Sequence, residues 1–347
     1  MELPSTLAGQ EDYIYENVPD VQTGRMAHIG VLRSTSSYNI FTTEGSELNL
    51  AETMATPDSE NEIERIVMFK RKQVAAERRT GKKLLRGLYK NNKIEEREEA
   101  FGRFKNGEDG KDKTDKELCR LHDALCGRCV DCKLYGFANA ESDVDGSRRS
   151  RVLTDSAFSI RGLEDRREDI TFNAQSEENE SEASTALNSR AHTKPETFFP
   201  SIVTLVDFTY RELYWLVNLL RDTTRYGAET SRTGYIENEL VSVWFDTRET
   251  LSNLELAQRT RAELENDNGD TEIMTQEKVL SAMEKVLPNS DVTLNLSEKK
   301  EKNSPDDDES QDNTLEKDVE KKLNSDKSQI KFLKKLHQAQ VGDSSES

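Results

Sequence analysis

A chain of 347 residues is long enough for one large domain or two ordinary ones. Because only 33% of the residues are hydrophobic and 33% are charged, part of the chain is expected to lie outside any packed core. A net charge of −18 argues at first sight against a nucleic-acid partner, and no apolar run is long enough to span a membrane. We therefore expect a soluble protein without a membrane partner. The polar, acidic N-terminus lacks a secretory signal and predicts a cytoplasmic location.

The charges are strongly segregated along the chain. Residues 1–64 hold twelve acidic and two basic side chains, whereas residues 65–86 hold nine basic side chains against the single acid Glu77. Such segregation favours a protein that binds a polyanion on one face. A basic run of this kind is also typical of a solvated helix face, and that alternative stays open.

Short strands are expected in the first part of the chain. Residues 26–33 and 38–42 have strand-like composition around the turn 34–37, and the apolar run 66–69 predicts a buried strand that leads into the basic segment. From about Gly87 the chain becomes charged and rich in Gly, Lys and Asp, which predicts an excursion, that is, an inserted segment outside the packed fold.

That excursion leads to all four cysteines of the chain, which are spaced Cys119-x6-Cys126-x2-Cys129-x2-Cys132. Thiolates two residues apart on a turn converge, and a tetrahedral zinc ion needs four such ligands. A disulfide is disfavoured in a reducing compartment. We therefore predict a structural zinc site, with His122 as the alternative to Cys119; an iron–sulfur cluster and free or redox thiols stay open as other interpretations.

The second half of the chain has clearer signals. Residues 151–160 and 199–206 predict strands, and the polar stretch between them predicts a long protruding loop. Thr209-x-x-Glu212 is a capping box in front of a helical apolar stripe that ends near Asp222, and residues 240–245 predict another strand. Strand, helix, loop and strand in this order are typical of the second half of a ferredoxin-like βαββαβ unit, so we predict an α+β fold.

The loop that follows the capped helix, TTRYGAETSRTG, is a candidate for nucleic-acid contact. Arg225, Tyr226 and Arg232 lie there among hydroxyl groups and two glycines, which would let a phosphate backbone approach closely. An ordinary polar loop is the alternative. The aromatic motifs of a conventional RNA-recognition domain are absent, so backbone contact is favoured over base stacking on the sheet.

A helix is predicted at about 272–287, and the low-complexity Lys/Asp/Glu/Ser composition beyond Glu298 predicts a disordered tail. The sequence offers little support for catalysis: the histidines are dispersed, and neither a Walker loop nor an HExxH motif is present. A metal-dependent nuclease built on a carboxylate such as Asp155 or Asp207 stays open as an alternative.

Three runs carry a resemblance to a known family: MAHIGVLRSTSSYNIFTTEG, CGRCVDCKLYGFANAESDVDGSRRSRVLTDSAFSI and TFFPSIVTLVDFTYRELYWLVNLLRDTTRYGAETSRTGYIENELV. In this order, over roughly residues 25–250, they resemble the backbone subunits of type I-D CRISPR surveillance complexes (Cascade). These proteins belong to the RAMP superfamily of modified RRM folds. The cysteine knuckle before a YGxA-like step and the TTRYGAxTxRTG segment are the most specific parts.

The resemblance implies an α+β architecture: a ferredoxin-like or RRM palm with a zinc-binding insertion, a thumb-like loop and the disordered tail. The implied parts are the first part of the palm with the acidic N-terminus (1–86), the zinc insertion (87–149), a palm strand (150–161), the thumb (162–197), the second part of the palm (198–295) and the tail (296–347).

It also implies an antiviral ribonucleoprotein in which several copies line up along a guide CRISPR RNA, beside other effector subunits, and present the guide to target DNA or RNA. No enzymatic activity is implied. The expected RNA-binding residues are Arg33, Lys70, Arg71, Lys72, Arg78, Arg79, Lys82, Lys83, Arg148, Arg149, Arg151, Arg225, Tyr226 and Arg232. The alternative is a zinc-stapled regulatory protein that binds duplex DNA without a guide, or a metal-dependent nuclease subunit of the same assembly.

Overall fold

The computed structural model describes most of the chain, in eleven segments. These are residues 3–43, 45–91, 119–121, 125–127, 129–138, 147–172, 188–227, 232–268, 274–292, 314–323 and 331–336. Among the helices within these residues, none has the length and apolar character that a membrane crossing requires.

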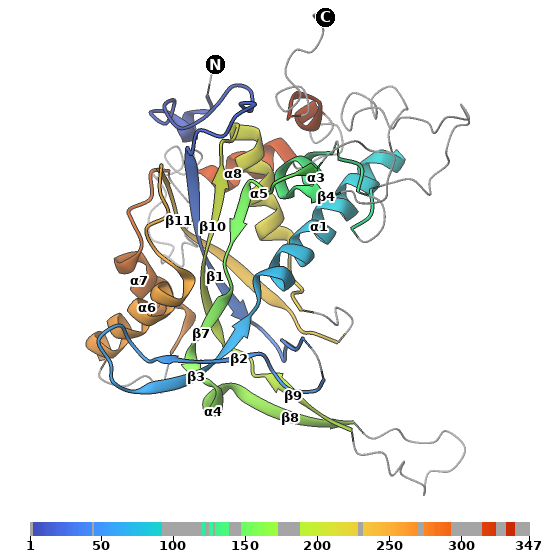
Figure 1. The fold of residues 1–347 in the computed structure, drawn as a ribbon. Helices are drawn as coiled ribbons and strands as arrows, with labels where there is room; N and C mark the ends of the chain where they lie inside the picture. The colour runs from blue at the N-terminus through green and yellow to red at the C-terminus, as the bar shows by residue number, and fades with distance from the viewer. Residues whose placement is uncertain are drawn as a thin grey trace, which may run out of the picture.

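A four-stranded antiparallel sheet forms the centre of the molecule (Figure 1). Its strands, in spatial order, are β11 (Ile236–Asp246), β1 (Met26–Thr35), β10 (Phe198–Val206) and β6 (Val152–Thr154). All nine residues of β10 are buried, because helices cover both faces of the sheet. The strands predicted over 26–33, 199–206 and 240–245 are confirmed inside β1, β10 and β11.

Two long helices pack against one face of this sheet and against each other, α1 (Lys70–Asn91) and α5 (Tyr210–Asp222). The predicted capping box of α5 is present: Thr209 accepts a hydrogen bond from the backbone of Glu212, and the Glu212 carboxylate accepts one from the backbone of Thr209. Along the chain, the main sheet and these helices follow the order strand, helix, strand, strand, helix, strand.

A second antiparallel sheet consists of β2 (Leu50–Met54), β3 (Glu62–Met68) and β7 (Ala157–Gly162). The predicted buried strand at 66–69 is confirmed as the end of β3. The single strand predicted over 151–160 is wrong, because the chain breaks at Asp155–Ser156 and passes from β6 in the main sheet to β7 in this one. The strand predicted at 38–42 is also wrong; only Asn39 forms an isolated bridge there, to Thr193.

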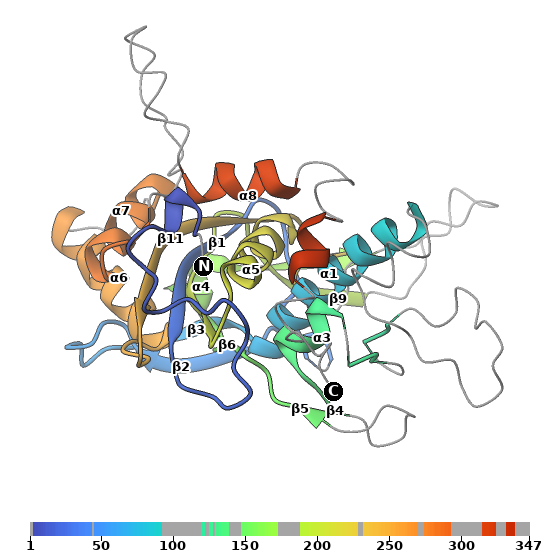
Figure 2. The ribbon, with the colours of Figure 1, turned by 90° about the horizontal axis from the view of Figure 1, so that it is seen from above.

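The opposite face of the main sheet is covered by α6 (Asn253–Asn268) and α7 (Gln276–Val286), as Figure 2 shows. The predicted helix at 272–287 is confirmed as α7. The sequence did not indicate α6, which buries a narrow stripe of Asn253, Leu256, Ala257, Thr260 and Leu264 against the sheet layer.

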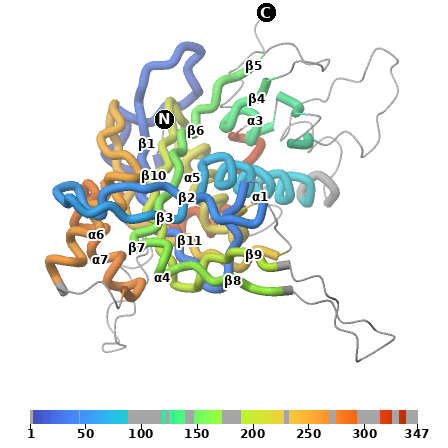
Figure 3. The backbone as a smooth tube through the Cα atoms, turned by 60° about the horizontal axis from the view of Figure 1, so that its bottom comes forward, coloured from blue at the N-terminus to red at the C-terminus, as the bar shows by residue number. Residues whose placement is uncertain are grey.

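The segment expected to be a long loop is a β-hairpin that projects from the body (Figures 1 and 3). After the short helix α4 (Leu163–Arg166), strand β8 (Arg167–Phe172) pairs with β9 (Asn188–Thr193) over six residues on each side. The prediction of irregular structure is therefore wrong for these strands, which alternate apolar and polar residues too weakly to be recognised from the sequence. Residues 173–187 lie outside the described residues.

The predicted disorder of the C-terminal tail is wrong for residues 314–323 and 331–336. Helix α8 (Leu315–Leu323) and the helical residues 331–336 bury their apolar side chains in the same core as α5. Helix α8 also contacts the short N-terminal 3-10 helix η1 (Ser5–Leu7). The low overall hydrophobicity of the tail concealed the stripe of Leu315, Val319 and Leu323 in α8, and the helical residues 331–336 add Phe332, Leu333 and Leu336 to the same core.

Candidate metal centre and nucleic-acid interface

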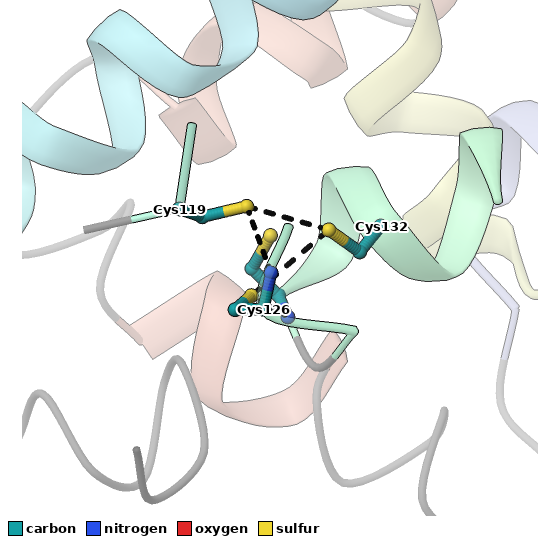
Figure 4. Close-up of side chains that lie close together, drawn as sticks. Cys119, Cys126 and Cys132 are labelled. Atoms are coloured by element: carbon teal, nitrogen blue, oxygen red, sulfur yellow. Dashed lines mark hydrogen bonds between the residues drawn. The ribbon is translucent and has the colours of Figure 1, made fainter. Parts of the chain in front are cut away.

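The four cysteines converge on one point (Figure 4). Their sulfur atoms all lie within 4.8 Å of one another, and the Sγ atoms of Cys119 and Cys132 are 3.4 Å apart. Tetrahedral zinc with Zn–S bonds of about 2.3 Å requires sulfur atoms about 3.8 Å apart. All four side chains are buried and none forms a disulfide. The cluster thus has the donor set and spacing of a four-thiolate metal site.

The local fold positions these thiols. Cys129 is the N-cap of α3 (Val130–Tyr135), and its backbone N–H donates to Sγ of Cys126 over 3.3 Å. Helix α3 ends at Gly136, whose φ of 74° places it in the left-handed region. A Cβ at this position would lie 2.4 Å from the carbonyl oxygen of Arg148. Only glycine therefore lets the chain turn back from the knuckle into the hairpin β4 (Phe137–Ala138) and β5 (Ser147–Arg148).

Cations from α1 surround the cluster. Nζ of Lys82 lies 2.8 Å from Sγ of Cys119 and 2.8 Å from Oδ2 of Asp131, and Arg78 donates two hydrogen bonds to the same Asp131 oxygen. Burial opposes the charge of Lys82, but Cys129, Asp131 and Cys119 outweigh it and raise the pKa of Lys82 above its ordinary value. Four thiolates around a divalent ion carry a net charge of −2, so these cations fit an occupied site.

The four cysteines therefore fit a metal that prefers thiolate ligands, as predicted. Cys119 reaches the cluster itself, while His122, its predicted alternative, lies outside the described residues. Four thiolates are a ligand set that zinc shares with iron–sulfur centres, so both metal sites fit this geometry.

Several predicted RNA-binding residues lie inside the protein instead. Arg33 is fully buried, 3.1 Å from the buried carboxylate of Glu77. Tyr226 is fully buried as well, and the Arg33 guanidinium lies over its ring. Neither side chain can reach a phosphate group in this fold, so their predicted contacts are wrong. The reason is that Arg33, the lone base in the apolar strand β1, pairs with Glu77, the single acid of the basic segment 65–86.

The predicted RNA contacts of Arg151 and Lys82 are wrong for the same reason. The Arg151 guanidinium forms an ion pair with Glu212 and donates to the carbonyl oxygen of Asp207 over 2.8 Å, and its exposed fraction is 4%. Lys82 has an exposed fraction of 2% and is held by the cysteine cluster. Arg78 is mostly buried against Asp131. These cations fasten α1, α3 and α5 to one another.

The remaining basic residues of the prediction lie at the surface. Helix α1 carries most of them on its solvent side, and the others follow the metal knuckle or the end of α5. Exposed are Lys70, Arg71, Arg79, Lys83, Arg149, Arg225 and Arg232, and half-buried are Lys72 and Arg148.

Like charges gather around Lys72 on the surface of α1. Burial, followed by the like charges of Arg71 and Arg79, lowers the pKa of Lys72 below its ordinary value. Positive charge gathered in this way attracts a polyanion.

The glycines of the segment 223–234 serve the fold. A Cβ on Gly227 would lie 2.6 Å from the carbonyl oxygen of Ile40, and one on Gly234 would lie 2.0 Å from Oγ of Ser37. The two glycines therefore allow a close approach of the backbone, as predicted, but the partner is the protein's own loop 36–40 and not a phosphate group. Arg225 donates to the carbonyl oxygen of Thr233 within this segment.

The sequence analysis missed the acidic partners of the buried cations. Glu77, Asp131 and Glu212 each hold a cation in the interior, and Tyr135 donates to Glu77 over 3.2 Å. One signal was available for Glu77, because a single acid in the middle of nine bases is the natural partner of a buried base. Asp207, named as a possible nuclease residue, accepts hydrogen bonds from the backbones of Thr23, Gly24 and Arg25 and fixes a turn.

In structural class, this is an antiparallel α+β protein with a buried four-cysteine knuckle and a projecting hairpin. Residues 13–333 match the family model described as Csc2 CRISPR. The chain therefore belongs to the Csc2 CRISPR family.

The fold is similar to that of a solved Csc2 structure. The crystal structure of Thermofilum pendens Csc2 is 19% identical, with a TM-score of 0.54 over 97% of each chain. A chain of a type IV-B CRISPR complex matches 65% of this chain and 93% of its own length, with 10% identity and a TM-score of 0.41. A chain of a CRISPR RNA-guided surveillance complex in a pre-nicking state matches 74% of this chain and 86% of its own, with 10% identity and a TM-score of 0.45. No curated protein matches.

Proposed function

We propose that this protein is the guide-RNA-binding backbone subunit of a type I-D antiviral effector complex (Cascade). Several copies polymerise along one CRISPR RNA in the cytoplasm, together with other effector subunits, and present the guide for pairing with target DNA or RNA. The protein reads the sugar–phosphate backbone and the RNA reads the sequence. The subunit itself performs no catalytic step.

The observation that carries this proposal is the family match over residues 13–333. The order of strands and helices in the main sheet supports an RRM-like palm, made of residues 1–86, 150–161 and 198–295. In the same proposal, residues 87–149 are a zinc-bearing insertion and the hairpin around 162–197 is a thumb.

The exposed bases of α1 support contact with the RNA backbone. Lys70, Arg71, Lys72, Arg79 and Lys83 lie on one helix, and like charges act on Lys72 among them. Arg148 and Arg149, which follow the metal knuckle in the chain, and Arg225 and Arg232, which follow the end of α5, are further basic residues with solvent exposure. The acidic surplus of the whole chain does not cancel this local charge, because exposed charges farther away than about 10 Å are screened at ordinary ionic strength.

Purification of a tagged copy from its own host, followed by sequencing of the RNA bound to it, tests the proposal. We expect uniform short RNAs that carry repeat and spacer sequences. Random cellular RNA or no RNA would contradict the proposal. Binding of duplex DNA by the RNA-free protein would then favour the zinc-stapled regulator, and target cleavage abolished by EDTA would favour the nuclease.

A further inference from the structure

A cavity of about 690 Å³ lies at the foot of the projecting hairpin. Four elements meet around it: the end of β1, the β7–α4 turn, the chain that leads from β9 into β10, and the start of α7. None of its lining residues belongs to the basic surface on α1 or to the cysteine cluster. Its lining includes Ser34, Ser36, Arg161, Arg166, Glu196 and Thr275.

Two arginines face this cavity from the same short stretch of chain. Burial, followed by the like charge of Arg166, lowers the pKa of Arg161 although Asp165 and Glu196 act in the opposite direction. Arg166 donates only at 3.4 Å to the carbonyl oxygens of Pro195 and Glu196, at the limit of a hydrogen bond. Within the described residues its buried Nε has no partner. Arg166 therefore keeps donor capacity toward the cavity, whereas Arg33 and Arg151 are held by buried carboxylates.

Groups that bind anions complete the lining. Helix α7 begins at Gln276, with Thr275 as its N-cap, and both residues line the cavity. The Thr275 hydroxyl accepts the N–H of Lys278, so the positive end of the helix dipole lies beside the cavity at Gln276. Ser34 lines the cavity with an exposed fraction of 3%, and among the described residues its Oγ has no hydrogen-bond partner. A buried hydroxyl without a partner costs free energy, which a ligand oxygen would recover. Among the described residues that line the cavity, Glu196 is the one carboxylate, and it is exposed, so solvent screens its repulsion.

Two exposed tyrosines lie close in the chain to residues of the cavity or are hydrogen-bonded to them. The backbone N–H of Ser36, a lining residue, donates to the carbonyl oxygen of Tyr235 over 3.0 Å, so the backbone of Tyr235 lies beside the cavity wall. Tyr235 and Tyr38 are exposed by 44% and 42%, and they belong to the few large apolar side chains that the described residues leave in solvent. Stacking on aromatic rings beside a phosphate-binding groove is how proteins hold single-stranded nucleic acid.

We propose that this cavity is a nucleotide subsite for single-stranded RNA. Arg161, Arg166, Ser34 and the first turn of α7 hold one phosphodiester group, and Tyr235 stacks on an adjacent base. This inference rests on the proposed function, because it assigns part of the guide RNA to a place on the protein outside the α1 surface.

Arg161→Gln/Arg166→Gln tests the phosphate part, with fluorescence anisotropy of a labelled single-stranded RNA measured over a series of salt concentrations. Without the two cations that hold one phosphate, binding is expected to weaken about tenfold and the salt slope to fall by about 0.7. Arg259→Gln/Lys285→Gln is the matched control, since it removes two exposed cations from α6 and α7, each of which is paired with a carboxylate. The control is expected to keep the wild-type slope.

Tyr235→Ala tests the stacking part in the same assay. Binding should weaken by at least about fivefold, because stacking contributes about 1–3 kcal/mol per base. The salt slope should stay at the wild-type value, since no charge is removed. Tyr235→Phe retains the ring and is expected to retain wild-type binding.

The outcomes separate the two proposals. If the wild-type protein binds no RNA, the proposed function fails and this inference fails with it. If the wild type binds RNA but the arginine and Tyr235 variants bind with wild-type affinity and slope, only the subsite is overturned. Should the double variant lose its folded circular dichroism spectrum, photocrosslinking of the wild type to 4-thiouridine RNA decides: adducts at Tyr235 or at residues 195–198 support the subsite, and adducts confined to other peptides overturn it.

Discussion

Glu212 holds two parts of the molecule with one carboxylate. It closes the capping box at the start of α5, and it pairs with the buried guanidinium of Arg151, which also donates to carbonyl oxygens of Asp207 and Lys133. The helix end, the main sheet and the metal knuckle are thereby joined through one ion pair. Removal of one partner from such a pair leaves the other charge buried and unpaired.

Arg151→Met is therefore expected to lower the free energy of unfolding by about 3–5 kcal/mol, measured by urea denaturation. The double variant Arg151→Met/Glu212→Gln should recover part of this loss, because the glutamine keeps the cap and carries no buried charge. A loss below about 1 kcal/mol in the single variant would contradict the buried pairing.

The cysteine cluster gives a prediction about metal content. Cys129→Ser removes one thiolate ligand and puts a residue that N-caps helices well before α3, so bound metal should fall below about a tenth of the wild-type amount and residues near the knuckle should become sensitive to protease. Elemental analysis and limited proteolysis measure the two effects, with chelator-treated wild-type protein as the control. Wild-type metal content in the variant would contradict the four-thiolate site.

At the residue scale, sequence spacing predicted the thiols but not their surroundings. Three of the cysteines lie within seven positions, so their convergence is a local property of the chain. Lys82 reaches Cys119 across 37 positions, and that interaction depends on how α1 packs. For the same reason, counting charges could not separate the bases of α1 that face solvent from Arg78 and Lys82, which face Asp131.

Among the elements, α1 carries most of the predicted basic residues that lie at the surface. Lys70→Ala/Arg71→Ala/Lys72→Ala should weaken binding of single-stranded RNA and reduce the salt slope by about 0.7 for each phosphate that the variant no longer neutralises. The helix should keep its thermal stability, because its interior contacts come from Glu77, Arg78 and Lys82. Wild-type slope in this variant, with RNA binding intact, would show that RNA follows another surface.

Helix α8 is held to α5 and η1 by Asp318. Its carboxylate accepts hydrogen bonds from Lys322, Thr6 and Tyr214. Burial alone would raise the pKa of Asp318, but the hydrogen bonds from Lys322 and Tyr214 outweigh it and lower the pKa. A carboxylate with a lowered folded-state pKa stabilises the docked helix above its unfolded-state pKa of about 3.9, and this contribution is lost as the pH falls through the folded-state value.

Asp318→Asn is accordingly expected to speed hydrogen exchange of residues 315–323 at pH 7. As the pH falls through the lowered folded-state pKa of Asp318, the variant and the wild type should exchange at increasingly similar rates, because the wild-type carboxylate then becomes protonated. Lys321→Gln serves as a control that leaves these hydrogen bonds in place. Equal exchange of Asp318→Asn and wild type at pH 7 would show that the apolar stripe alone docks the helix.

Elements with a complete local signal were predictable from the sequence. Helix α5 has a capping box and a wide apolar stripe, and β10 has a continuous apolar run, so both were found with nearly correct bounds. Helices α6 and α8 bury narrow stripes in charged sequences, and their stability comes from the surfaces they cover. The β8–β9 hairpin depends on cross-strand pairing, which sequence periodicity did not reveal.

At the scale of the whole molecule, the proposed function predicts a stoichiometry that depends on RNA length. Each copy should cover a fixed number of nucleotides, so native mass spectrometry with synthetic RNAs of increasing length should show stepwise addition of protein copies. The steps should disappear at high salt, because a protein with a net charge of −18 depends on local cations to hold a polyanion. One copy per RNA at every length would contradict polymerisation along the guide.

The docking of α8 and residues 331–336 against α5 and η1 has a consequence for biosynthesis. Ribosomes extend the chain from the N-terminus, so α5 emerges with an uncovered apolar face long before the segment that covers it has been translated. A nascent or prematurely terminated chain thus exposes the apolar face of α5 to solvent. We expect such intermediates to recruit chaperones and to aggregate until residues 314–336 have left the exit tunnel.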